Sequence, residues 1–240
     1  RSCMAMDINL GCSGWVYGLS VLSSLMQTGN IKKAILLAGD ARKQAKEELD
    51  QLFGYACTAT ALEYSKEAKP FYFDLGTDGT GYDAIIRPGG GCRNQFNEDS
   101  LKLELCEDGR KRHAIQTRMK GMDVFAFGIT TAPKSIKKLT ANYEMDYTSF
   151  DYVILHQANY KMTETIRKKL KLDAEKMPYS MLHFGNTSSA SIPLTIVTQL
   201  KGKIEDKPTK IIGCAFGVGL SWGTVAFETE HLLISELVEV

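Results

Sequence analysis

Cys12 is the residue of this chain best suited to attack a carbonyl carbon. It lies in a turn between an apolar run and a helical pattern, with Gly11 and Gly14 on either side. The start of a helix offers unpaired N–H groups and a partial positive charge, and both favour thiolate over thiol. Because thiolate is the attacking form, the position predicts a nucleophile. A free cysteine considered alone more often serves only as a small buried apolar residue.

His156 and Asn186 are the candidates to assist it. His156 follows the apolar run 151–155, and the carboxyl ends of strands are where open α/β sheets bind ligands. An imidazole there can donate or accept a proton near pH 7, although a core histidine without catalytic role is the alternative. Asn186 precedes a small polar segment in which Ser188 or Ser189 can serve simply as a helix cap.

The segment 216–223 forms a glycine-rich turn between two predicted strands. Its backbone N–H groups can face a developing oxyanion, whereas a tight hairpin would need the glycines for backbone geometry alone. The segment has no lysine of a phosphate-binding loop. Cysteine, histidine and asparagine, each at a turn after a strand, together suit acyl-thioester chemistry.

Composition excludes several other classes of function. The chain has 240 residues, 44% apolar and 24% charged, as in soluble globular proteins, and a net charge of +1 gives no argument for nucleic acid or membrane partners. No apolar run approaches the roughly 20 residues of a membrane span, and no signal peptide is recognisable. Six cysteines without a C-x-x-C pair predict free thiols, no metal site and a cytoplasmic location.

Strands and helices are expected to alternate along the chain. The predicted strands are 5–10, 33–39, 59–64, 152–155, 210–215 and 223–228, and the predicted helices are 14–27, 122–142, 162–170 and 191–200. We expect 33–39 to be buried, 71–105 to be a loop-rich connection with a short strand at 83–87, and Pro133 to kink or break its helix. This alternation indicates an α/β fold with a largely parallel sheet.

The chain resembles the β-ketoacyl-acyl-carrier-protein synthase III family of the thiolase superfamily. The matching motifs are D-x-x-x-x-C-x-G-x-x-x-x-L from Asp7 to Leu19, M-x-G-x-x-V-F from Met119 to Phe125, H-Q-A-N from His156 to Asn159, G-N-T-S-S-A-S-I-P from Gly185 to Pro193 and F-G-x-G-x-S-W-G from Phe216 to Gly223. Motifs in this order are highly specific. They favour a catalytic role for Cys12 over the role of a buried apolar residue.

The resemblance implies a thiolase-like α/β fold with duplicated halves. Each half would carry a mixed five-stranded sheet in an α-β-α-β-α layering. Residues 1–105 would be an incomplete N-terminal half with the nucleophile and connecting loops, and 106–240 the C-terminal half with histidine and asparagine. The family usually has a longer N-terminal part, so we expect the natural protein to be longer, with another segment covering an apolar sheet edge near Cys12.

The resemblance also implies a reaction. Cys12 would take an acyl group from acyl-CoA. His156 and Asn186 would hold malonyl-acyl-carrier protein as it loses carbon dioxide, and the carbanion would attack the acyl-cysteine to give a 3-oxoacyl product. The backbone N–H groups of Cys12 and Gly219 would form the oxyanion hole. No cofactor is implied beyond the CoA and carrier-protein thioesters that serve as substrates.

Further residues and partners follow from the same resemblance. Lys161 and Asn159 would meet the pantetheine or carrier-protein side of the substrate, although a solvated helix lysine is an equal alternative for Lys161. The partners would be acyl-CoA, acyl-carrier protein and a second copy in a homodimer, with no nucleic acid and no membrane. Tyr55, Cys57 and Val218 depart from the family pattern, and Val218 would narrow the acyl site.

Two other functions stay open from the sequence. One is an acyltransferase of the same family that moves the acyl group to an alcohol, an amine or another thioester. The other is a non-catalytic assembly partner, which would be expected to lose the nucleophile that this chain keeps.

Overall fold

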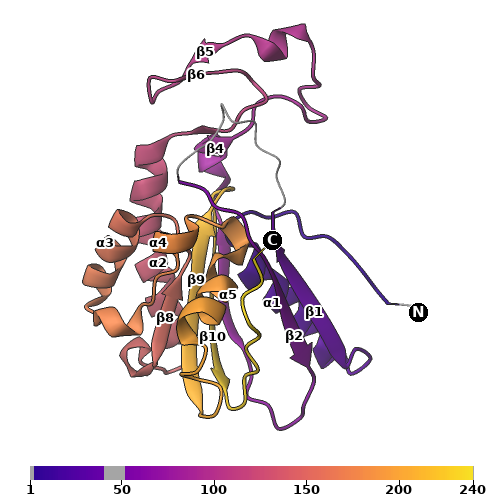
Figure 1. Ribbon diagram of the computed structural model, residues 1–240, viewed down its shortest axis with the longest axis vertical. Coiled ribbons are helices and arrows are strands. Elements are labelled where there is room, and N and C mark those ends of the chain that lie inside the picture. The colour runs from indigo at the N-terminus through magenta and orange to yellow at the C-terminus, as the bar shows by residue number, and fades with distance from the viewer. Residues whose placement is uncertain (1–2, 41–51, 240) are drawn as a thin grey trace.

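A four-stranded mixed sheet forms the centre of the computed structural model, which describes residues 3–40 and 52–239 (Figure 1). Its strands, in spatial order, are β3 (Tyr72–Thr77), β10 (Ser221–Thr229), β9 (Thr209–Gly217) and β8 (Tyr152–Leu155). Only β8 and β9 run parallel, and the other neighbours in this sheet are antiparallel. The largely parallel sheet expected from the alternation is therefore wrong here. The sheet is mixed, as the resemblance implies, but in the described residues it has four strands rather than five.

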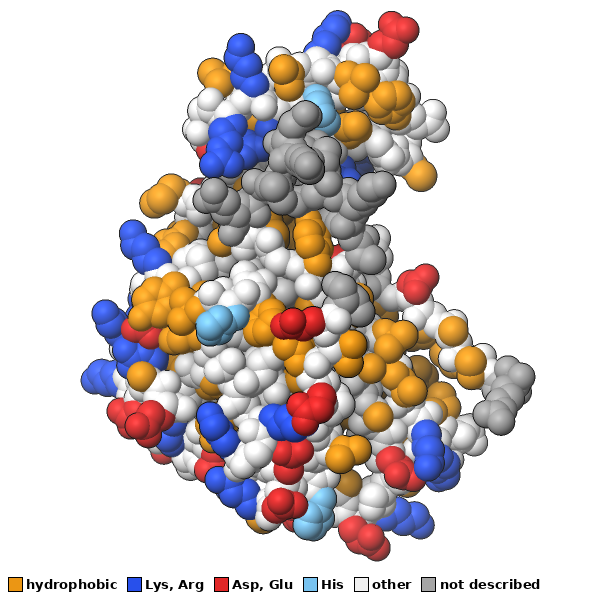
Figure 2. All heavy atoms as spheres, in the orientation of Figure 1, with side chains coloured by type: hydrophobic (Ala, Val, Ile, Leu, Met, Phe, Trp, Pro, Cys, Tyr) orange, Lys and Arg blue, Asp and Glu red, His pale blue; other side chains and the backbone are white. Residues whose placement is uncertain are grey.

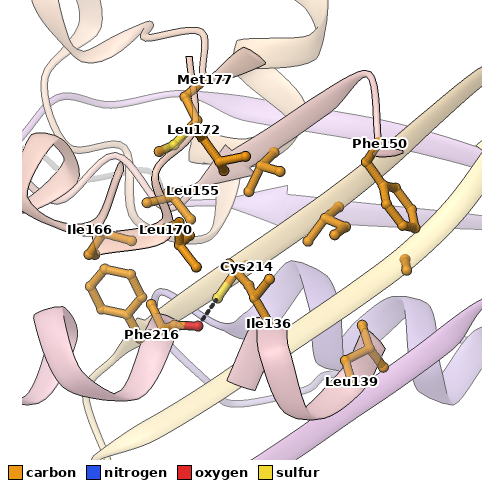
Figure 3. Close-up of a cluster of buried hydrophobic side chains, with 14 of the residues drawn as sticks. Ile136, Leu139, Phe150, Leu155, Ile166, Leu170, Leu172, Met177, Cys214 and Phe216 are labelled. Atoms are coloured by element: carbon orange, nitrogen blue, oxygen red, sulfur yellow. Dashed lines mark hydrogen bonds between the residues drawn. The ribbon is translucent and has the colours of Figure 1, made fainter. Parts of the chain in front are cut away.

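Two long helices cover one face of this sheet. These are α2 (Gly121–Asn142) and α3 (Tyr160–Leu170), and α2 runs on through Pro133 as one helix. Alternate strand residues such as Val153 and Leu155 point toward them, because successive side chains of a strand face opposite sides. Figure 3 shows the resulting core, in which Ile136, Leu139, Leu155, Ile166, Leu170, Cys214 and Phe216 pack together.

The opposite face packs on α1 (Gly14–Gln27) and α5 (Ser191–Thr195). Ile154, whose side chain points away from those of its two neighbours, belongs to this second core with Trp15 and Ile192. Beyond α1 lies an antiparallel pair, β1 (Lys33–Gly39) and β2 (Cys57–Glu63). The Trp15 indole donates to Thr60 Oγ1 at 3.0 Å and joins the helix to this pair. The layers in the described residues are thus helix, sheet, helix and sheet.

The outer face of the β1–β2 pair is open to solvent. Ile35 and Leu37 are 66% and 76% exposed, so the expected burial of 33–39 holds for one face of the strand only. An extended N-terminal segment also carries exposed apolar side chains, Met4 and Met6. Figure 2 shows the orange apolar side chains of these two segments gathered on one side of the molecule.

Short elements complete the chain. They are β4 (Ile85–Ile86), β5 (Glu104–Leu105), β6 (Lys111–Arg112), β7 (Arg118–Met119) and α4 (Met181–Phe184), with 3-10 turns at Gly79–Gly81, Glu98–Leu101, Tyr147–Ser149, Ala174–Lys176 and Ser188–Ala190, and a π-helical turn at Ile196–Leu200. The β5–β6 hairpin projects away from the sheets at the top of Figure 1. No helix in the described part of the chain is long and apolar enough to cross a membrane.

Two of the predicted elements need correction. Residues 5–10 form no strand, because no other described segment pairs with them and most of their side chains are exposed. The loop predicted over 71–105 begins with β3, which pairs with β10 far along the chain. The boundary between halves at residue 105 stays a prediction.

Candidate active site

Cys12 lies half-buried in the turn that leads into α1. The loop between β9 and β10 approaches Cys12 so closely that a Cβ on Gly217 would lie 2.8 Å from the Cys12 Sγ. Only glycine fits at that contact. The next residue, Val218, hydrogen-bonds the thiol through its backbone. Two distant segments, the nucleophile turn and the loop between β9 and β10, are therefore packed directly against each other.

Burial decides the protonation of the Cys12 thiol. It raises the pKa of the thiol above the usual value, while hydrogen bonds from the Ser188 side chain and the backbone of Val218 lower it by less. The thiol of the ligand-free site is therefore protonated at neutral pH. The pKa is therefore raised rather than lowered as expected from the helix start, because desolvation outweighs the hydrogen bonds to the sulfur.

His156 follows β8 at the centre of the molecule and is 2% exposed. Its backbone N–H donates to the Cys214 carbonyl at 2.8 Å, and its Nδ1 lies 2.8 Å from the Ser191 Oγ. Burial lowers the pKa of the imidazole to about 4, and a hydrogen bond to the Ser188 backbone opposes that shift. The imidazole is therefore neutral near pH 7 and can accept a proton or donate a hydrogen bond.

Asn186 is held by a parallel bridge to the first half of the chain. Its backbone N–H donates to the Leu52 carbonyl at 2.8 Å, and its carbonyl accepts from the Gly54 N–H at 3.0 Å. A Cβ on Gly54 would lie 1.7 Å from the Phe184 carbonyl oxygen, so only glycine permits this pairing. The side-chain Oδ1 accepts from the Ser188 N–H at 2.9 Å, which fixes the orientation of the amide.

The three predicted residues meet at Ser188. Its side chain hydrogen-bonds Cys12, its backbone hydrogen-bonds His156, and its N–H binds Asn186. The structure thus brings together a thiol, a neutral imidazole and a buried carboxamide from three separate segments. Such a group can form an acyl-cysteine and then stabilise the negative charge of an enolate.

The remaining predicted residues are placed differently. Gly219 is exposed with a φ of 137°, and it is Val218 whose backbone hydrogen-bonds the thiol. The oxyanion role predicted for Gly219 stays a prediction. Asn159 caps α3, its Oδ1 accepting from the Met162 N–H at 2.9 Å. Lys161 is exposed, with its Nζ 5.9 Å from the centroid of the Phe125 ring.

Sequence reasoning missed several supporting residues. The sequence indicates Ser188 only as a helix cap, and it gives no sign that Ser191 contacts His156 or that Val218 contacts Cys12. Gln157, inside H-Q-A-N, is fully buried and accepts from the Ser180 N–H at 3.0 Å, so it holds the segment that leads to Asn186. The only local signal was their place inside the motifs.

Helices on both faces of a mixed sheet, with a thiol, an imidazole and a carboxamide brought together beside it, define a thiolase-like α/β protein. Two family profiles match the chain: "3-Oxoacyl-[acyl-carrier-protein (ACP)] synthase III" over residues 6–79 and its C-terminal counterpart over residues 140–229. The chain belongs to the 3-oxoacyl-[acyl-carrier-protein] synthase III family.

Individual relatives agree with this family. The beta-ketoacyl-[acyl-carrier-protein] synthase III of Clostridium tetani is 31% identical over 91% of this chain and 66% of its own length. A putative 3-oxoacyl-[acyl-carrier-protein] synthase 3 of Campylobacter jejuni is also 31% identical, over 98% of this chain and 66% of its own. The crystal structure of a 3-oxoacyl-(acyl-carrier protein) synthase from Burkholderia xenovorans superposes with a TM-score of 0.87 at 34% identity, covering 99% of this chain and 68% of that one. This chain therefore spans about two thirds of the length of these relatives.

Proposed function

We propose that the protein is a condensing acyltransferase that makes a 3-oxoacyl-acyl-carrier protein from acyl-CoA and malonyl-acyl-carrier protein, a step of fatty-acid or related biosynthesis. The observation that carries the proposal is the convergence of Cys12, His156 and Asn186 on Ser188. The names of the relatives support the choice of substrates.

In the first step Cys12 becomes acylated. The neutral imidazole of His156 accepts the thiol proton as the sulfur attacks the carbonyl carbon of acyl-CoA. The backbone N–H groups of Cys12 and Gly219 stabilise the oxyanion. The bond to the CoA sulfur then breaks, CoA leaves with the proton from His156, and the imidazole is neutral again.

In the second step the malonyl group loses carbon dioxide. The electron pair of the broken carbon–carbon bond forms the enolate of the carrier-protein thioester, whose oxygen accepts hydrogen bonds from His156 and Asn186. The enolate carbon attacks the acyl carbon on Cys12. The carbon–sulfur bond breaks, the 3-oxoacyl product leaves, and the Cys12 thiolate takes up one proton from water.

The site needs no metal or redox cofactor for these steps, and the partners we propose are acyl-CoA and acyl-carrier protein. Lys161 and Asn159 stand at the start of α3, and an exposed lysine there suits an anionic pantetheine phosphate or an acidic carrier protein. We also propose a homodimer in the cytoplasm. The exposed apolar side chains of Ile35 and Leu37 support burial against a further protein surface.

Intact mass spectrometry tests the reaction. The protein is incubated with a panel of acyl-CoAs, and we expect a mass gain of one acyl group that Cys12→Ser abolishes. Malonyl-acyl-carrier protein should then discharge the acyl group and release carbon dioxide. In His156→Ala and Asn186→Ala the release of carbon dioxide should fall more than the initial acylation.

Other outcomes would select the other functions. Discharge of the acyl group to an alcohol, an amine or a thiol without release of carbon dioxide would identify a simple acyltransferase. No mass gain with any donor would indicate a non-catalytic assembly partner.

A further inference from the structure

We propose that Ser191 is a positioning residue for His156 and that its hydroxyl binds the imidazole in both of its neutral forms. The Ser191 Oγ lies 2.8 Å from the His156 Nδ1, and the two residues are 1% and 2% exposed. The role concerns the reaction described above and therefore rests on the proposed function. The contact itself exists in the ligand-free protein and can be tested there.

The Ser191 hydroxyl is not committed to one direction of hydrogen bonding. Within residues 3–40 and 52–239 it has no hydrogen-bond partner other than the imidazole. A hydroxyl carries one proton and two acceptor lone pairs, so it can donate to a bare Nδ1 or accept from an Nδ1–H. The Ser188 backbone also hydrogen-bonds the ring, but a backbone group suits only one tautomer. Ser191 is the partner that can serve either.

The two steps of the proposed reaction need opposite tautomers of His156. Because Nδ1 faces Ser191, we assign the contact with the reacting groups to Nε2. Acylation requires a bare Nε2 to accept the Cys12 proton, and Nδ1–H then donates to the Ser191 Oγ. Decarboxylation requires Nε2–H to donate to the enolate oxygen, and the Ser191 hydroxyl then donates to Nδ1. Between the steps the ring releases its Nδ1 proton and takes up one at Nε2, a net exchange with water that changes no other group.

The hydroxyls packed behind Ser191 are, by contrast, fixed in direction. The Thr195 Oγ1 donates to the Ser191 carbonyl at 2.7 Å and lies 2.7 Å from the Ser180 Oγ. Since the only proton of the Thr195 hydroxyl is used, Thr195 must accept from Ser180. Both residues are buried. These bonds hold the backbone of Ser191 and leave its side chain able to face either form of the imidazole.

Gln157, the residue after His156, extends this support to the segment of Asn186. Its Oε1 accepts from the N–H groups of Ser180 and Met181 at 3.0 and 3.3 Å. The segment held in this way leads through α4 to Asn186. The imidazole and the carboxamide are therefore positioned by one continuous set of buried hydrogen bonds.

The wild-type protein tests the two-way hydrogen bond directly. In protein labelled with ¹⁵N-histidine at pH 7, the ring ¹⁵N shifts report which nitrogen is protonated, and the His156 signals are those absent from His156→Gln. We expect both tautomers, the minor one at no less than about a tenth of the total, because a larger preference would exceed the net value of one hydrogen bond. A ring held in a single tautomer would overturn the proposal.

Variants test the contribution to the reaction. In Ser191→Ala we expect the maximal rates of Cys12 acylation and of carbon dioxide release each to fall about fivefold, as for one lost hydrogen bond, with the KM for acyl-CoA unchanged. Ser191→Thr keeps the hydroxyl and should recover most of both rates. Thr198→Ala is the matched control, because the Thr198 hydroxyl donates to the Leu194 carbonyl at 2.8 Å rather than to the imidazole, and it should keep the wild-type rates.

Unchanged rates in Ser191→Ala, loss of only one of the two rates, or an equal loss in Thr198→Ala would also overturn the proposal. Should Ser191→Ala fail to fold, the tautomers of the wild-type protein still decide. Failure of the proposed function would appear differently, as a wild-type protein that shows both tautomers of His156 but gains no mass from any acyl-CoA.

Discussion

The hydroxyls of Ser13 and Ser221 lie 2.7 Å apart in the interior of the molecule, and both residues are fully buried. Ser221 donates its own proton to the Val218 carbonyl at 2.7 Å, so Ser13 is the donor between the two hydroxyls. This chain of hydrogen bonds joins the turn that carries Cys12 to the loop whose backbone faces the sulfur.

The two serines should contribute unequally to stability. Ser221→Ala leaves both the Ser13 hydroxyl and the Val218 carbonyl without a partner, and should lower the free energy of unfolding by about 1–3 kcal/mol. Ser13→Ala removes only a donor and should cost about 0.5–1.5 kcal/mol. Urea denaturation of both variants and the double variant checks this. Equal costs for the two single variants would contradict the donor order.

His156 should make the fold sensitive to acid. Its pKa is about 4 in the folded protein and 6.5 when unperturbed, so the unfolded chain binds a proton first as the pH falls. Stability from the neutral imidazole is complete above pH 6.5 and declines between pH 6.5 and 4, by roughly 3 kcal/mol in total. Urea denaturation at a series of pH values measures this loss.

A variant isolates this contribution from that of the carboxylates. In His156→Gln the decline of unfolding free energy between pH 6.5 and 4 should be shallower by about the same roughly 3 kcal/mol, whatever the stability of the variant at pH 7. The exposed His231 offers the matched control, and His231→Gln should retain the wild-type slope. Parallel curves for wild type and His156→Gln would show that the buried imidazole does not set the acid response.

Gly54→Ala should impair the site from a distance. A Cβ would lie 1.7 Å from the Phe184 carbonyl oxygen, so the bridge to Asn186 must move. We expect carbon dioxide release from malonyl-acyl-carrier protein to fall at least tenfold, since an ångström of misplacement costs about a hundredfold. Gly79→Ala is the control, since nothing lies within 4 Å of the added atom there. Similar decarboxylation rates in the two variants would count against a positioning role for the bridge.

Val218 should limit the size of the acyl group. Its Cγ1 would lie 2.4 Å from a Cβ on Gly11, so this methyl group fills the space beside the nucleophile turn. Val218→Gly should raise kcat/KM for longer or branched acyl-CoAs relative to acetyl-CoA by about tenfold, as expected for a few methyl groups of pocket volume. Competition between two acyl-CoAs, read by intact mass, measures the ratio. An unchanged ratio would place the acyl chain elsewhere.

Local sequence patterns were sufficient for several elements. The predicted helix 14–27 and the strands 33–39 and 152–155 have the observed bounds, because apolar spacing and flanking breakers act within a few residues. Local patterns were insufficient where pairing with a distant segment decides whether a strand forms. Residues 5–10 are as apolar as a strand but pair with nothing that is described, whereas β3, in a glycine-rich region, is a strand because β10 lies beside it.

The same limit explains the details of the site. The motifs located Cys12, His156 and Asn186, whose proximity depends on contacts between distant segments. The loop motif indicated an oxyanion site, but not that the backbone of Val218 hydrogen-bonds the thiol. The helix start predicted a lowered thiol pKa, but segments remote in sequence bury the thiol and reverse the sign.

The pairing of Leu52 and Gly54 with Asn186 has a consequence for recombining this protein with its relatives. A chimera that takes its first half from one homologue and its second half from another inherits the two sides of this bridge from different parents. The position of the crossover is therefore less important than whether the two sides of the bridge fit each other. Exchange of residues 52–54 together with 184–186 is the smallest swap that keeps the Asn186 carboxamide in its place.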